Sequence, residues 1–262
     1  MNNLRGVYTI WYRDILRFWH DKTRMIGSIT FPLLFLFVFG SGLSARMGFL
    51  GPGIDFTQFM FPGIIGMTVL MSSFMSGVSV VWDREFGFLK EVLVAPISRA
   101  SIVVGKTLGS ATIALLQGGL ILLFAPLIGV SLSAWTVLLL LPLMLLLSAS
   151  MGSLGILLAT RIRSMEAFQA VMQMLMFPMI FLSGVFFPTE GLPTWMSILV
   201  KINPATYGVA PIRQVMLGTS LDASFSLTLF GHTMSLWDNI IVLAVFGMIM
   251  ILLAMWSFSN QE

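Results

Sequence analysis

The sequence predicts an all-α membrane protein with six transmembrane helices, and two observations carry this prediction. The chain of 262 residues is 57% hydrophobic and only 10% charged, whereas soluble domains are about 25% charged. Its apolar residues also gather in six long stretches, each close to the roughly 20 residues that a helix needs to cross a bilayer. Such a chain cannot cover a water-facing surface, so the soluble classes are excluded.

Composition removes several kinds of site. The chain has no cysteine, which excludes disulfides and thiolate metal sites. Its two histidines, His20 and His232, are far apart in the sequence, and we predict neither a metal site nor a catalytic residue. The net charge is +3, but Lys and Arg lie beside apolar stretches rather than in one patch. This distribution favours membrane anchoring over nucleic-acid binding.

Residues 1–24 are predicted to form an amphipathic helix in the cytoplasmic membrane interface. Apolar residues recur there at helical spacing, with charged residues mostly between them. They are Leu4, Val7, Tyr8, Trp11, Ile15, Phe18 and Trp19. Trp and Tyr favour the headgroup level. A solvated cytoplasmic helix is the alternative.

Six spans follow, each mostly apolar and free of charge at its middle. They are predicted at Met25–Leu43, Met60–Val81, Thr107–Val130, Ala134–Thr160, Ala167–Phe187 and Asn239–Phe258. Between the last two lies the longest loop, residues 188–236, where two short amphipathic helices are predicted: one after Pro193 and one at Ala210–Leu217. These helices are expected to be re-entrant or to lie on the outer surface.

Orientation follows from Lys and Arg in the short loops. With the N-terminus in the cytoplasm, residues 1–24, 82–106 and 161–166 hold 11 basic residues, and the outer segments hold three. Six spans then place the C-terminus in the cytoplasm as well.

Polar residues inside the spans are few, and they suit either hydrogen bonds between helices or substrate contact. They are Ser72, Ser73, Ser76, Gln117, Ser148, Ser150, Gln169 and Gln173. A secondary carrier usually needs an ionisable group or an unwound ion site near the midplane. The absence of a charge at the middle of any predicted span argues against that class.

A charged segment at 82–106 interrupts the apolar pattern. It holds seven charged residues, yet the stretch Glu85–Arg99 also carries an apolar side, and Pro96 is expected to end its helix. A turn that needed only solvation would not combine these features. The segment fits the membrane surface or a groove on a partner protein.

Four stretches resemble the ABC-2 type permeases, the membrane subunits of bacterial ATP-binding cassette exporters. They are Gln58–Gly63, Glu85–Arg99, Leu182–Pro188, and Asn203–Tyr207 followed by Arg213. The chain is similar in particular to the daunorubicin-resistance and nodulation-factor exporter branch. The likeness covers the whole chain, 1–262, as a single transmembrane domain of the ABC-2, or type V exporter, fold.

The resemblance implies a cytoplasmic coupling helix that docks on a separate ATPase. Its residues here would include Glu85, Phe88, Leu89, Glu91, Val92 and Pro96. Two ATP-binding subunits would carry ATP and Mg, so this chain would be no enzyme and would hold no cofactor. A second permease subunit, identical or different, would complete the assembly in the inner membrane.

The translocation path would lie at the interface of the two permeases, lined by the second and fifth spans. Its candidates are Phe61, Met67, Met71, Phe74, Gln169, Met172 and Gln173. An extracellular gate would include Phe187, Asn203, Pro204, Tyr207 and Arg213. The Met- and Phe-rich composition favours a hydrophobic or amphiphilic substrate, such as a drug, a lipid or a glycolipid-like molecule. The alternatives are an ATP-independent secondary carrier and a membrane scaffold without transport.

Overall fold

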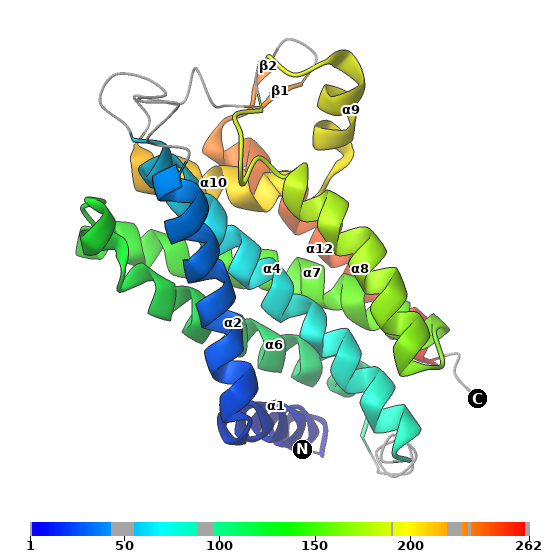
Figure 1. Ribbon diagram of the computed structural model, residues 1–262. Coiled ribbons are helices and arrows are strands. Elements are labelled where there is room, and N and C mark those ends of the chain that lie inside the picture. Colours follow the sequence, from blue (N-terminus) through cyan, green and yellow to red (C-terminus); the bar gives the residue numbers. More distant parts are fainter. Residues whose placement is uncertain are drawn as a thin grey trace.

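The computed structural model describes residues 2–42, 55–87, 97–189, 191–218, 227–229 and 232–259. Apart from one short pair of strands, the regular elements in this part of the chain are helices, most of which run side by side as a bundle (Figure 1). In chain order they are α1 (Asn2–His20), α2 (Lys22–Phe35), the π-helical turn η1 (Leu36–Gly40), α4 (Phe56–Glu85), α6 (Arg99–Leu122), the 3-10 turn η2 (Ala125–Ile128), α7 (Ala134–Arg161), α8 (Met165–Phe181), α9 (Thr194–Ile202), α10 (Thr206–Leu217), β1 (Thr228–Leu229), β2 (His232–Thr233) and α12 (Leu236–Ser259).

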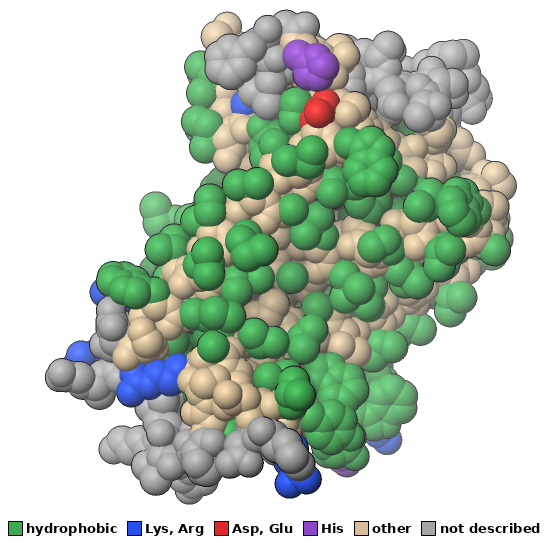
Figure 2. All heavy atoms as spheres, turned by 180° about the vertical axis from the view of Figure 1, so that it is seen from behind, with side chains coloured by type: hydrophobic (Ala, Val, Ile, Leu, Met, Phe, Trp, Pro, Cys, Tyr) green, Lys and Arg blue, Asp and Glu red, His purple; other side chains and the backbone are tan. Residues whose placement is uncertain are grey.

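Five helical segments of the described chain are long and apolar enough to cross a membrane. They are α2 with η1, α4, α6, α7 and α12. The remaining predicted span corresponds to α8, which is apolar but has only 17 residues, at the lower limit of about 17 for a span. The all-α membrane class is therefore confirmed, and the sixth span stays a prediction. Figure 2 shows hydrophobic side chains over the middle of one face, with Lys and Arg gathered near one end.

The predicted boundary of the third span is wrong. It was placed at Thr107–Val130, but α6 begins at Arg99 and ends at Leu122. Ser98 begins the helix because its side chain accepts a hydrogen bond from the backbone N–H of Ser101. The predicted loop 82–106 therefore contains the last turn of α4 and the first two turns of α6, so its basic residue Lys106 lies within a helix.

Helix α1 lies across one end of the bundle (Figure 1) and packs on α6. Its inner face consists of residues four apart: Gly6, Ile10, Asp14 and Phe18 are all buried. Leu4, Tyr8 and Trp19 are exposed, as the amphipathic prediction expected. Phe18 is an exception, since the prediction placed it on the interfacial face. The fourfold spacing, rather than apolarity alone, decides which face is buried.

Helices α9 and α10 lie at the opposite end of the bundle, close to the strands β1 and β2 (Figure 1). The two predicted short helices are thus present, and the second runs from Thr206 through Pro211 to Leu217. The antiparallel pair of strands, with Thr228 opposite Thr233, was not predicted. Each strand has only two residues, too few for an alternating pattern to be recognised in the sequence.

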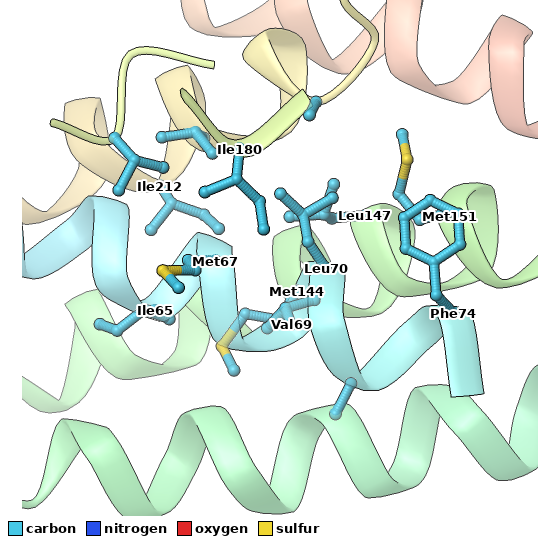
Figure 3. Close-up of a cluster of buried hydrophobic side chains, with 14 of the residues drawn as sticks. Ile65, Met67, Val69, Leu70, Phe74, Met144, Leu147, Met151, Ile180 and Ile212 are labelled. Carbon is cyan, nitrogen blue, oxygen red and sulfur yellow. The ribbon is translucent and has the colours of Figure 1, made fainter. Parts of the chain in front are cut away.

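The core lies around α4, where Met67, Leu70 and Phe74 meet side chains of α7 such as Leu147 and Met151 (Figure 3). Two helices can approach each other closely only where small residues lie between them. A side chain at Gly77 would meet the backbone carbonyl oxygen of Gly155 and the ring of Phe168. The small residues at Gly105 and Gly109 serve the contact with α1, because added side chains there would touch Ile10 and Asp14.

The Gly77→Ala variant is expected to destabilise the bundle by about 1–3 kcal/mol, because the backbone of α7 cannot move aside for the added methyl group. The matched control is Gly119→Ala in α6, where an added side chain meets nothing within 4 Å. Alanine is the better helix former, so this variant should be neutral or more stable by up to about 1 kcal/mol. Thermal unfolding in detergent measures both, and equal melting temperatures would contradict the close contact.

Candidate functional site

A cluster of charged residues joins three helices at the α1 end of the bundle. The charge cluster consists of Arg13, Asp14 and Arg17 from α1, Asp83 from α4 and Lys106 from α6. The Lys106 ammonium group lies 2.7 Å from Asp83 Oδ2 and donates a further hydrogen bond, also 2.7 Å, to Ser79 Oγ. Arg13 Nη2 donates to the same Asp83 oxygen at 2.6 Å. Two cations from different helices thus share one carboxylate.

The remaining members close the charge cluster. Asp14 lies 3.2 Å from Arg13 and 3.9 Å from Lys106. Arg17 lies 3.9 Å from Asp83 Oδ1, and its guanidinium stacks over the Trp82 ring at 4.3 Å. Lys106 is only 2% exposed, and a charge so deeply buried is tolerated only when it is paired and hydrogen-bonded.

Asp83 and Lys106 lie near the two ends of the predicted charged segment 82–106, and the sequence did not predict that they pair. The signal that could have found them is the Ser98 cap. A helix that starts at Arg99 puts Gly105, Lys106 and Gly109 within its second and third turns, and two glycines beside a lysine indicate a close helix neighbour.

The end of α4 is tied to α7 and α8 as well. Glu85 Oε1 accepts a hydrogen bond of 2.7 Å from the backbone N–H of Met165, the first residue of α8. A carboxylate is favourable there because helix N-termini carry a partial positive charge. Arg84 Nη1 donates to the carbonyl oxygens of Ala159 and Ile162 at the end of α7, at 2.9 and 2.8 Å.

Of the predicted coupling residues, Glu85 is the one that the structure describes. It contacts α8 in its own chain, which the sequence did not predict. The other five lie outside the described residues, so their coupling role stays a prediction. They are Phe88, Leu89, Glu91, Val92 and Pro96.

The predicted path residues do not form one surface of this chain. Phe61, Met67, Phe74 and Met172 are buried in the hydrophobic core, and Figure 3 shows Met67 and Phe74 within it. Gln173 is exposed. Met71 and Gln169 each border one of two neighbouring cavities beside α4, of about 300 and 260 Å³. Of the predicted path residues, Gln173, Met71 and Gln169 are therefore the ones that a substrate moving along these helices could contact.

Other polar residues of the spans connect helices. Ser73 donates to Ser148 Oγ at 2.8 Å, and Ser76 donates to the carbonyl oxygen of Gly152 at 2.8 Å. Gln117 donates to Ser28 Oγ at 2.6 Å. These contacts confirm the hydrogen-bonding interpretation for these residues. Ser72 differs from these residues, because its buried hydroxyl has no hydrogen-bond partner in the structure.

The predicted gate residues lie where α8, α9 and α10 meet. Asn203 Nδ2 donates to the Met179 carbonyl oxygen at 2.7 Å, and the Tyr207 hydroxyl donates to the Lys201 carbonyl oxygen at 2.6 Å. Phe187 and Pro204 are half-buried beside them. The sequence thus gathered residues that the structure brings to one end of the bundle.

Arg213 is the most deeply buried member of this group. Its guanidinium donates to the Gly184 carbonyl oxygen and lies 4.1 Å from the centre of the Phe59 ring. Burial lowers the pKa of Arg213 to about 9, so the side chain is still a cation at neutral pH. The carbonyl dipole and the ring face replace part of its hydration. Arg213 therefore ties α10 to α4 and to the segment after α8.

The described residues contain no group of three or more His, Asp or Glu side chains arranged to hold a metal ion. These residues form a helical bundle. Ion pairs connect its helices at one end, hydrogen-bonded short helices lie at the other end, and two cavities lie beside α4. A family model described as ABC-2 type transporter matches residues 5–217. The chain belongs to the ABC-2 type transporter family.

Relatives agree with this assignment. The transport permease ycf38 of Cyanophora paradoxa is 32% identical over 234 residues, which are 87% of this chain and 80% of the relative. Nodulation protein J of Rhizobium leguminosarum bv. viciae is 27% identical over 80% of this chain and 81% of its own length. The inner membrane transport permease YadH of Escherichia coli K12 is 28% identical over 80% and 82%.

This ABC-2 chain is therefore a multi-pass membrane transport subunit. Membership of the family implies partnership with an ATPase subunit. The four stretches that suggested the family in the sequence all fall inside the matched range.

The Asp83→Asn variant is expected to lose about 3 kcal/mol of stability, because it leaves the buried Lys106 and the half-buried Arg13 with one carboxylate fewer. Asp21→Asn is the control, since it removes the same charge from an exposed position and asparagine caps a helix as well as aspartate does. Thermal unfolding of both variants in detergent measures the difference. A melting temperature for Asp83→Asn equal to that of the control would show that the charge cluster contributes nothing.

Proposed function

We propose that the chain is the permease subunit of an ATP-binding cassette exporter that moves a hydrophobic or amphiphilic substrate outward. ATP and Mg would be bound by two copies of a separate ATPase subunit, and a second permease subunit would complete the path. The chain would lie in the inner membrane with both termini in the cytoplasm. Family membership and the named transport relatives support the class of protein.

One observation carries the coupling part of this proposal: the last turns of α4 are joined to four other helices. Asp83 holds α1 and α6, Arg84 holds α7, and Glu85 holds α8. The proposed coupling helix, residues 85–96, begins at this junction. A movement of that segment by an ATPase would therefore act on all five helices at once. Coupling of this kind needs a partner whose two states contact the segment differently.

At the other end of α4, the proposed gate supports the same mechanism. Arg213 of α10 lies over Phe59 of α4, and Gly66 of α4 lies against Val209 of α10. Helix α4 thus contacts the proposed gate directly, and it ends at Glu85, the first residue of the proposed coupling segment. Rigid elements packed in this way can carry a displacement from one end of a bundle to the other.

The Glu91→Lys variant is expected to reduce substrate-stimulated ATP hydrolysis by the cognate ATPase about ten-fold, which corresponds to 1.4 kcal/mol of lost coupling. We propose that Glu85 and Glu91 pair with basic residues of the ATPase. A reversed charge at Glu91 should repel those residues, while the permease should still reach the membrane. Co-purification of the two subunits and ATPase activity in proteoliposomes measure the effect. Full coupling in Glu91→Lys would contradict the proposed pairing.

Two substitutions of Glu85 separate its roles. Glu85→Gln keeps an oxygen that can accept from the Met165 N–H but removes the charge, whereas Glu85→Ala removes both. If Glu85 also pairs with the ATPase, both variants should lose coupling. If it only anchors α8, Glu85→Gln should resemble the unmodified chain.

Transport that persists without any ATPase and stops with an ionophore would instead favour the secondary carrier.

A further inference from the structure

Two neighbouring cavities lie between α2 and the rest of the bundle, and three residues border both. The first, of about 260 Å³, is lined by residues of α1, α2, α4, α6 and α8 and by Asp21 between α1 and α2, and the second, of about 300 Å³, by residues of α2, α4 and α6. Arg24, Ser72 and Met75 border both cavities. Together the cavities form one groove along α2 and α4, called the α2–α4 groove below.

Ser72 is the residue that points to a ligand. It is only 6% exposed, and its hydroxyl has no hydrogen-bond partner. Other hydroxyls of α4 are satisfied by the helix itself: Thr68 donates to the Ile64 carbonyl oxygen, and Ser76 donates to that of Ser73. A buried hydroxyl is expected to find a partner. In the α2–α4 groove, water or a polar group of a bound molecule can supply that partner.

Arg24 supplies a charge at the same point. It is the third residue of α2 and belongs to a candidate membrane span. Asp21 accepts a hydrogen bond from the backbone N–H of Arg24 at 3.0 Å, but no ion pair of the Arg24 guanidinium with a carboxylate occurs among the described residues. The guanidinium lies 5.9 Å from the centre of the Phe18 ring. An arginine at the end of a span can reach the headgroup level of the membrane.

The other charged groups that line the first cavity are Asp14, Arg17 and Asp21, and each already has a partner. Asp21 accepts from the backbone N–H of Arg24. Asp14 is held by Arg13 and Lys106, and Arg17 lies against Asp83 and the Trp82 ring. Arg24 is therefore the cation that remains for an anion. A guanidinium and a hydroxyl are suitable donors for a phosphate or carboxylate group.

The second cavity is mainly apolar. Phe31 and Pro32 of α2 face Met71 and Met75 of α4 across it. Methionine side chains adapt to irregular hydrocarbon shapes. The α2–α4 groove thus combines a cationic, hydrogen-bonding junction with an apolar extension, which is the pattern of an amphiphile with a charged headgroup.

We propose that the α2–α4 groove binds an anionic amphiphile, with its headgroup at Arg24 and Ser72 and its hydrocarbon tail against Phe31, Pro32 and Met71. This inference names a substrate class for the proposed exporter. It rests on the proposed function only for the claim that the bound molecule is transported. Binding itself requires neither ATP nor an ATPase.

The test titrates the purified chain, in a neutral detergent, with dioleoyl phosphatidic acid and with dioleoyl phosphatidylcholine. Bound lipid is counted by native mass spectrometry. Phosphatidic acid should bind at least ten-fold more tightly than phosphatidylcholine. Arg24→Gln should lose about ten-fold in affinity for phosphatidic acid, whereas Arg24→Lys should lose less, since the charge is kept. The matched control is Lys22→Gln, an exposed cation of the same helix that borders neither cavity, and it should bind as the unmodified chain does.

Two further arms keep the proposal falsifiable if Arg24→Gln does not fold. Ser72→Ala should weaken binding a few-fold, and Met71→Trp, which fills the apolar part, should abolish it. Inorganic phosphate should bind at least a hundred-fold more weakly than phosphatidic acid. If inorganic phosphate binds as tightly as phosphatidic acid, the groove binds a small anion and the amphiphile proposal is wrong. If Lys22→Gln and Arg24→Gln bind phosphatidic acid equally well, Arg24 does not form the site.

The same data separate this proposal from the proposed function. Specific binding of phosphatidic acid with no effect on ATP hydrolysis in the complete transporter would keep the lipid site and remove the claim of transport. Normal ATP-driven transport by a chain that binds phosphatidic acid and phosphatidylcholine equally would keep the exporter and overturn the site.

Discussion

The arrangement of this bundle depends on the ion pairs that the Asp83 carboxylate forms with Lys106 and Arg13. This carboxylate lies at the point where α1, α4 and α6 meet, and it accepts from Lys106 and from Arg13 within 2.7 Å. A buried ammonium group without such a partner would be strongly unfavourable. The three helices therefore have to stay in register with one another. The glycines at 105 and 109 are part of the same requirement, because they let α1 approach α6 closely enough to bring Arg13 and Asp14 to the site.

Helix α4 distributes this constraint through the molecule. At one end, Asp83, Arg84 and Glu85 connect it to α1, α6, α7 and α8. In its middle, Gly77 allows the backbone of α7 to come close, and Met67 and Phe74 belong to the core (Figure 3). At its other end, Phe59 lies under Arg213 of α10. A transport subunit driven by a separate ATPase needs one element that contacts both ends, and α4 is the helix with these contacts.

Helix α2 stands in contrast, because half of its residues are exposed and Pro32 is its only buried residue. It is linked to α6 by the hydrogen bond between Gln117 and Ser28. It also contacts α4, with the cavities that Arg24 and Ser72 border beside this contact. A loosely packed helix beside a tightly packed one is a suitable place for an exchangeable ligand, since opening it disrupts few core contacts. Ion pairs and glycines thus fix α4 against α1, α6 and α7, whereas cavities lie between α4 and α2.

The amino-acid sequence by itself determined the membrane class, the order of the helices and the family. Long apolar stretches can satisfy their backbone groups in a bilayer only as helices, and the four family motifs are local patterns that need no knowledge of packing. Asn203, Tyr207 and Arg213, which the resemblance grouped, lie at one end of the bundle, and their role in a gate stays a prediction. What only the tertiary structure decided is which polar residues meet. Lys106 and Asp83 are 23 residues apart, and Arg13 is 70 residues from Asp83. Their pairing depends on how α1 crosses α6, which the pattern of one helix does not specify. The same holds for Ser72, because its lack of a partner follows from the position of α2 and not from its neighbours in the chain.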